Sequence, residues 1–229
     1  MRRTFWLAVA LVPTFAMAQP APGRVSSVRA TGEAVFSAKP DTARLDLGVV
    51  TFASSAQAAA SQNATEVQAV LDKLHAALGP HAQIRTANYS LNPNYQPPRP
   101  GEQPAISGYT ASNTVEVTTG ELSDLGKLID AASQAGANHI QGLQFLLRND
   151  APVRAQVLEQ AVQAARANAQ TMAAAMGMKL GRVLLLEQGA PSEIRPLARM
   201  AASLAVAPTP VESGTLEVRA TVTLTVELQ

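Results

Sequence analysis

The segment from residue 216 to residue 228 constrains the fold most, because apolar and polar residues alternate along it without interruption. Side chains of a β-strand point alternately to opposite faces of its sheet, so this period predicts a long strand with one buried face. The other face is expected to stay uncovered and to carry threonine. The apolar positions are Leu216, Val218, Ala220, Val222, Leu224, Val226 and Leu228, and the threonines are Thr215, Thr221, Thr223 and Thr225.

Similar alternation and short apolar runs predict further strands. The segment Lys39-Pro40-Asp41-Thr42 places proline where a type I turn favours its fixed φ. We therefore expect the strands on either side, at residues 28–38 and 43–49, to form a hairpin. The other predicted strands are residues 84–91, 108–118, 140–147 and 183–186.

Three helices are predicted from apolar residues at helical spacing. Ser54-Ser55 can cap the first helix and Gly79-Pro80 ends it, Gly136 ends the second, and Asp150 can cap the third. The buried stripe of the third helix is expected to be Val157, Ala161, Ala164, Ala165, Met172 and Met176.

The order of these elements predicts an α+β fold. We expect a mixed, largely antiparallel sheet with three helices on one face, so that the other face is available to a partner. Strand–helix–strand occurs twice in comparable form, at residues 43–90 and 110–147, which indicates two related units.

Two proline-rich segments interrupt this pattern. Residues 92–105 contain five prolines and are expected to form a loop that cannot join a sheet. Residues 189–213 contain four prolines, and long loops of this kind are commonly disordered or functional. Disorder is favoured there over a short amphipathic helix formed by Leu197, Met200, Ala201 and Leu204.

The N-terminus has the features of a cleavable signal peptide. A basic start is followed by an apolar run at residues 5–12 and by the small-x-small sequence Ala16-Met17-Ala18. The apolar run is far shorter than the ~20 residues that span a bilayer. We therefore expect residues 1–18 to be removed and residues 19–229 to form the mature, exported domain.

Charge and residue types argue against several classes of function. The formal net charge is +1, from 18 basic and 17 acidic residues, so no excess field attracts nucleic acid. The absence of cysteine excludes a thiolate nucleophile and a cysteine-ligated zinc site. His75, His81 and His139 lack partners at metal-ligand spacing, and no hydrolase, phosphate-loop or dinucleotide motif occurs. We expect no catalytic site, no metal site and no cofactor.

The three tyrosines form the one cluster that points to a surface role. Tyr89, Tyr95 and Tyr109 lie within 21 residues and bracket the loop at residues 92–105. Tyrosine is favoured at protein interfaces because its ring is apolar while its hydroxyl stays hydrated. An interface role and simple cover of a sheet edge are both consistent with this pattern.

An ordered set of short motifs along the chain resembles the SIMPL-domain family of exported bacterial proteins. The resemblance spans essentially the whole mature chain, although no single motif is diagnostic. The motifs are Thr31-Gly32-Glu33-Ala34-Val35, Ala38-Lys39-Pro40-Asp41-Thr42-Ala43, Tyr89-Ser90-Leu91, Gly108-Tyr109-Thr110-Ala111-Ser112-Asn113, Gly136-Ala137-Asn138 and Leu180-Gly181-Arg182-Val183.

The resemblance implies a periplasmic or outer-membrane-associated protein without known enzymatic activity. For some members it implies a link to oxidative-stress defence or to host immune recognition, and for some a ring-like or channel-like oligomer. We therefore expect a non-enzymatic homo-oligomer that acts through its surfaces. The alternative is a periplasmic binding module that holds a small or lipidic ligand, which a pocket of about 300 Å³ or more with an apolar lining would favour.

Overall fold

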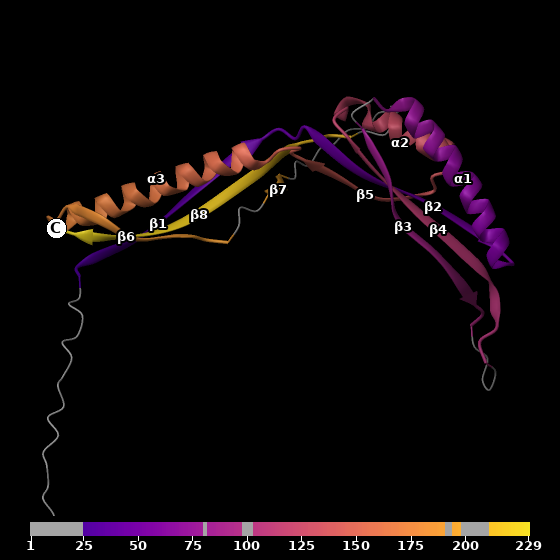
Figure 1. Cartoon of the computed structure of the whole chain (residues 1–229), viewed down its shortest axis with the longest axis horizontal. Helices are drawn as coiled ribbons and strands as arrows, with labels where there is room; N and C mark the ends of the chain where they lie inside the picture. Colours follow the sequence, from indigo (N-terminus) through magenta and orange to yellow (C-terminus); the bar gives the residue numbers. More distant parts are fainter. Residues whose placement is uncertain (1–24, 80–81, 98–102, 191–193, 198–210) are drawn as a thin grey trace, which may run out of the picture.

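The computed structural model describes residues 25–79, 82–97, 103–190, 194–197 and 211–229. Within these residues the chain forms two antiparallel sheets and three α-helices, which confirms the α+β class. Figure 1 shows the two sheets end to end in an elongated arch, with α3 on one sheet and α1 and α2 on the other. All three helices lie on the convex side of the arch, so both sheets leave their concave faces open (Figure 1). We call these the helix faces and the open faces.

The first sheet, which we call the α3 sheet, has β8 (Thr215–Leu228) at its centre. β1 (Ser27–Ala38) pairs with one edge of β8, and β6 (Leu180–Gln188) and β7 (Ile194–Leu197) pair with the other. Every second residue of β8 is buried beneath α3 (Ala151–Ala175), as the alternation predicts, and the threonine face is only half-buried.

The second sheet, which we call the α1–α2 sheet, has the order β3 (Gln83–Tyr95), β4 (Ile106–Thr119), β2 (Thr42–Ala53) and β5 (His139–Leu146). Its helix face is covered by α1 (Ala56–Ala77) and α2 (Leu125–Gln134), the latter preceded by a 3₁₀ turn at Leu122–Asp124. The core between sheet and helices is aliphatic and includes Leu45, Leu47, Leu74, Val115 and Leu125.

The predicted hairpin of the first two strands is wrong. β1 pairs with β8 over its whole length, from Ser27 opposite Glu227 to Ala38 opposite Leu216, whereas β2 pairs with β4 and β5. The backbone N–H of Asp41 donates to Leu146 O at 3.2 Å, which directs the chain toward β5 instead of back along β1. The strands that were expected to form a single sheet therefore form two sheets, each covered by its own helices.

The helix starts agree with the sequence only in part. Ser55 caps α1, because its side-chain oxygen accepts a hydrogen bond from Ala58 N at 3.2 Å. Asp150 precedes α3 without capping it, since its carboxylate instead accepts from Arg154 Nε at 2.7 Å. Asn149 Oδ1 accepts from Ala151 N at 3.2 Å and takes the place of the expected cap.

The buried stripe of α3 consists of small residues, and the prediction that it includes Met172 and Met176 is wrong. The buried positions are Val157, Ala161, Ala165, Ala169 and Ala173. Gly32 of β1 lies directly beneath the helix, where an added Cβ would overlap the backbone of Ala161 and Ala165. So close an approach leaves no room for methionine, and Met172 and Met176 are 45% and 56% exposed.

Both proline-rich segments take part in sheets, contrary to expectation. β3 continues through Pro93, which lies opposite Tyr109, and ends at Tyr95 opposite Ile106. An edge strand tolerates proline because the missing N–H costs no hydrogen bond on its outer side. In the second segment β7 pairs with β8. The predicted signal peptide and most of the predicted helix near residue 200 lie outside the described residues.

Candidate functional site

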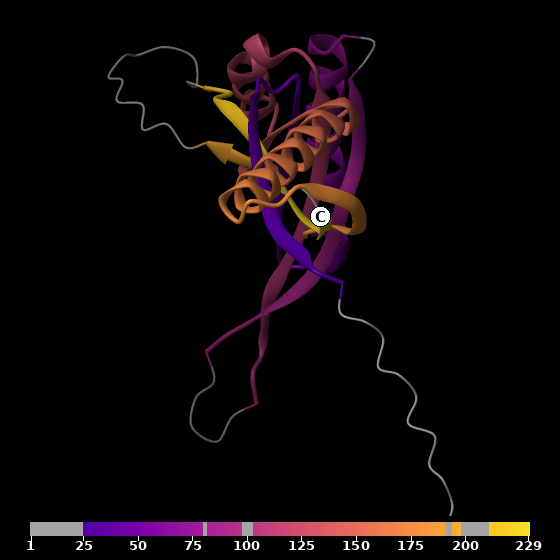
Figure 2. The ribbon, with the colours of Figure 1, turned by 90° about the vertical axis from the view of Figure 1, so that its left-hand side faces the viewer.

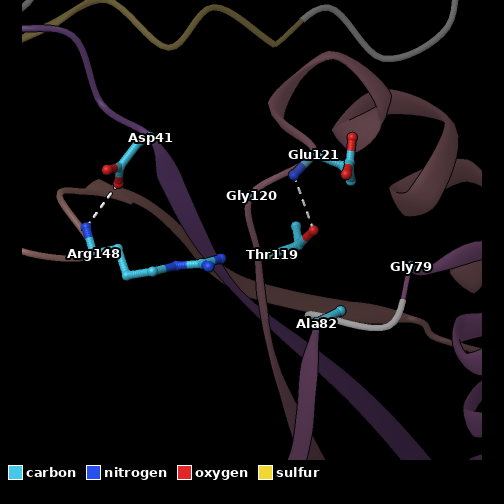
Figure 3. Close-up of a pocket in the computed structure, with 7 residues that line it drawn as sticks. All are labelled: Asp41, Gly79, Ala82, Thr119, Gly120, Glu121 and Arg148. Atoms are coloured by element: carbon cyan, nitrogen blue, oxygen red, sulfur yellow. Dashed lines mark hydrogen bonds between the residues drawn. The ribbon is translucent and has the colours of Figure 1, made fainter.

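A solvent-open pocket of about 330 Å³ lies where the two sheets meet, at the end of the α1–α2 sheet. It is formed by the link between β1 and β2, Gly79 and Ala82 from the link between α1 and β3, the end of β4 with the turn that follows it, and the link between β5 and α3 (Figure 3). The lining residues are Asp41, Gly79, Ala82, Thr119, Gly120, Glu121 and Arg148.

Hydrogen bonds to backbone fix the walls of this pocket. Asp41 Oδ1 accepts from Arg148 N at 2.7 Å, and Thr119 Oγ1 accepts from Glu121 N at 3.1 Å (Figure 3). The Arg148 side chain extends along the pocket toward Gly120, at which an added Cβ would lie 3.3 Å from Arg148 Nη2. The pocket therefore offers one guanidinium and the carboxylates of Asp41 and Glu121, and its described lining residues include no nucleophile hydrogen-bonded to a base.

Two further cavities adjoin this pocket. One, of about 400 Å³, lies between the end of α1 and α2, and it combines the apolar Ala77, Leu78, Leu128 and Ala131 with the charged Glu121, Asp124 and Lys127. The other, of about 510 Å³, is lined by residues of β2, β4 and the start of β3 together with Arg148. The 400 Å³ cavity reaches the size of a small-ligand site, although only part of its lining is apolar.

The two described histidines lie on different elements. His75 lies in the last turn of α1, His139 starts β5, and His81 falls outside the described residues. In the part of the chain that the structure describes, no three His, Cys, Asp or Glu residues form a group that could hold a metal ion. None of the described helices is long and apolar enough to cross a membrane.

An ion cluster lies on the open face of the α1–α2 sheet. Arg85 of β3 makes two hydrogen bonds to Glu116 of β4, from Nε at 2.7 Å and from Nη2 at 2.9 Å. Arg44 of β2 lies 3.7 Å from the same carboxylate. The hydrogen bond from Arg85 is the main reason why the pKa of Glu116 is lowered, and the Glu116 carboxylate in turn raises the pKa of Arg85.

The three tyrosines lie on the arm formed by β3 and β4, which projects beyond the helices (Figure 2). Tyr89 and Tyr95 of β3 are exposed, the latter by 58%, and Tyr109 of β4 is half-buried. Tyr89 lies opposite Asn113, and Tyr109 lies opposite Pro93 and Ala53. The rings are thus spread along the arm, and their role at an interface stays a prediction.

The sequence did not show that an exposed apolar segment lies at the edge of the α3 sheet. Residues 183–186 of β6 are four consecutive apolar residues, Val-Leu-Leu-Leu, and each is 39% to 59% exposed. A run of this kind is typical of a strand buried on both faces, so the sequence signal favours the opposite environment.

Comparison with known proteins identifies relatives along most of the chain. The family model SIMPL, described as "Protein of unknown function (DUF541)", matches residues 28–226. The "26 kDa periplasmic immunogenic protein" of Brucella melitensis is 31% identical over 192 residues, which are 82% of this chain and 77% of the relative. The "Uncharacterized protein YggE" of Escherichia coli is 29% identical over 153 residues, which are 67% of this chain and 61% of the relative.

The matched segment runs from β1 to β8, so it includes both sheets and all three helices of the structure. Together with the Brucella relative, this match confirms the resemblance found in the sequence. The chain belongs to the SIMPL (DUF541) family.

Proposed function

We propose that the protein is a non-enzymatic, self-assembling periplasmic protein that acts through its sheet surfaces. A periplasmic location is supported by the name of the Brucella relative and by the features of the N-terminus. We extend the proposal to association with the outer membrane and to an indirect part in oxidative-stress defence. The described residues offer surfaces for such a role rather than a catalytic constellation.

The observation that carries self-assembly is the β3–β4 arm. It projects from the body of the molecule (Figure 2), and Tyr95 and Ile106 are exposed near its end, while Tyr89 is exposed nearer the middle of β3. Exposed aromatic side chains on a projecting arm are typical of a surface that a partner covers. A second copy of the chain can cover it without any other component.

Light scattering coupled to size exclusion tests this proposal on the mature chain. We expect a multimer for the native protein and a smaller species for a Tyr95→Ser, Tyr109→Ser variant that remains folded by circular dichroism. The matched control is Met176→Ser, which removes an exposed apolar side chain from α3, far from the arm. A native chain that is monomeric at tens of micromolar would disprove self-assembly, and an unchanged multimer in the tyrosine variant would exclude the arm.

The second candidate function is a binding module for a small or lipidic ligand. The 400 Å³ cavity between α1 and α2 favours it, because Leu78 and Leu128 give it an apolar wall while Lys127 lies at its rim. Native mass spectrometry of protein from a periplasmic extract tests for a retained ligand. We expect Ala131→Phe, which fills the cavity, to abolish any retained mass, whereas Ala167→Phe on the exposed side of α3 should preserve it.

A further inference from the structure

β6 is an edge strand of the α3 sheet. It pairs with β8 through one edge, with register shifts on either side of Val183, and no strand among the described residues pairs with its other edge. Its middle residues, from Val183 to Leu186, are 39% to 59% exposed. An apolar edge with free backbone N–H and C=O groups promotes pairing with another strand, and proteins usually protect such an edge. β6 is therefore a surface that a strand can cover.

We propose that β6 pairs antiparallel with β6 of a second copy of this chain, about a two-fold axis between Leu184 and Leu185. This proposal rests on the proposed self-assembly and gives it a defined interface, separate from the β3–β4 arm. An antiparallel pair with this axis sets Val183 opposite the partner's Leu186 and Leu184 opposite the partner's Leu185.

The residues that flank the apolar run carry complementary charges in this register. The sequence from 182 to 187 is Arg-Val-Leu-Leu-Leu-Glu, so Arg182 lies opposite the partner's Glu187 at each end of the run. Opposite charges directly across an antiparallel pair are stabilising, whereas a parallel pair in register would place like charges together. The strand is therefore complementary to itself in the antiparallel sense.

The faces of the sheet agree with this pairing as well. Arg182 is on the open face, because its Nε donates to Glu227 at 2.8 Å, and Glu187 is on the same face, because it accepts from Arg29 Nη2 at 3.4 Å. Val183 and Leu186 lie opposite Val226 and Leu224, whose side chains are on the helix face. Residues three apart share this face because the register of β6 against β8 shifts between Val183 and Leu185, where Leu184 is an extra residue. A two-fold axis perpendicular to the sheet keeps each face on its own side, so charged residues meet charged residues and apolar residues meet apolar residues.

The existing contacts of the two charged residues do not prevent this pairing. The side chains of Arg182 and Glu187 are 73% and 51% exposed, and among the described residues each has one ion-pair partner, in its own sheet. In the pair of copies each would gain one further opposite charge, which extends two separate ion pairs into a network across the interface. α3 does not cover Val183 or Leu186, so the helix leaves the edge accessible.

Introduced cysteines test the register, since the chain has no cysteine of its own. Val183→Cys and Leu186→Cys are made separately in the full chain and purified in reduced form. They are then oxidised mildly, either alone or as an equal mixture, and intact mass and a non-reducing gel report covalent dimers. We expect the mixture to form a covalent heterodimer and each variant alone to remain largely uncrosslinked. A Leu158→Cys variant, on the side of α3, provides the background for random collision.

Charge reversal tests the same register without a covalent bond. In Arg182→Glu the introduced carboxylate lies opposite the partner's Glu187 at both ends of the apolar run, so like charges meet twice. We expect the dissociation constant of the dimer to rise about tenfold. The double variant Arg182→Glu, Glu187→Arg restores opposite charges and is expected to recover most of the affinity. Circular dichroism confirms that each variant is folded.

The outcomes separate this interface from self-assembly in general. A native chain that is monomeric at tens of micromolar overturns both proposals. If the native chain is a multimer but the mixture of the two cysteine variants stays uncrosslinked, the β6–β6 pairing alone is overturned. Pairing of β6 with β1 of the second copy would give this result. Crosslinking of either single variant alone, or no recovery in the double charge variant, also overturns it.

Discussion

Asp41 Oδ1 accepts a 2.7 Å hydrogen bond from the backbone N–H of Arg148, which is 107 residues away in the chain. Asp41 lies in the link between β1 and β2, and Arg148 lies in the link between β5 and α3. Both links carry the chain between the α3 sheet and the α1–α2 sheet. This bond, with the 3.2 Å bond from Asp41 N to Leu146 O, joins the two links side by side and forms one wall of the pocket at the junction.

We predict that Asp41→Ala lowers the free energy of unfolding by about 1 kcal/mol, because the Arg148 N–H and the hydroxyl of the buried Thr42 lose a charged acceptor. Asp41→Asn retains the Oδ1 acceptor and should lose less. Urea denaturation of both variants checks this prediction. Equal losses would show that the charge of Asp41, and not its hydrogen bonds, stabilises the junction.

Gly32→Ala should be one of the most destabilising small substitutions in the chain. The new Cβ would overlap the backbone of Ala161 and Ala165, so α3 must move away from β1. We expect a loss of about 2 to 4 kcal/mol, as in other overpacked cores. Gly142→Ala is the matched control, because the nearest atom to its Cβ is Asp46 Oδ2 at 3.9 Å. Thermal unfolding of the two variants should differ clearly, and similar midpoints would contradict the close helix–strand contact.

The ion cluster around Glu116 should make stability depend on pH. The pKa of Glu116 is lowered in the folded state, so its contribution is fully present above the pKa of about 4.3 for glutamate in an unfolded chain. The contribution is lost as pH falls through the lower, folded value. The stability difference between the native chain and Glu116→Gln should therefore shrink between neutral and acid pH in urea titrations.

Glu212→Gln is the control for this pH series, because it removes a carboxylate on an exposed residue outside the β-strands. A stability difference for Glu116→Gln that stays constant with pH would contradict the role of the Arg85 hydrogen bond.

Hydrogen peroxide should oxidise Met172 and Met176 before Met178. The first two are 45% and 56% exposed on α3, whereas Met178 packs partly buried against the core of the α3 sheet. Peptide mass spectrometry over a time course measures the order. Because methionine sulfoxide forms once per side chain and the chain has no cysteine, peroxide consumption should stop when the accessible methionines are oxidised. Sustained turnover by the pure protein would contradict a non-enzymatic role.

Most individual elements could be predicted from the sequence, because their signals are local. The alternation of residues 216–228 specified a strand with one buried face, and the serine pair before α1 supplied its cap. Asn149 took the capping role expected of Asp150, since the Asp150 carboxylate bonds to Arg154 instead. Which of two neighbouring residues caps the helix depends on the orientation of their side chains, and residue type alone does not specify that orientation.

What the sequence by itself determined is the set of strands other than β7, the three helices, the buried face of β8 and the family resemblance, since these follow from periodicity and short motifs. The tertiary structure decided which strands became neighbours. β1 and β2 are adjacent in sequence and alternate alike, yet only long-range burial beneath different helices assigns them to separate sheets. The same holds for β6, because a run of four apolar residues has no periodicity that distinguishes a central strand from an edge. Exposure is a property of what packs against a strand, and those neighbours lie far away in the chain.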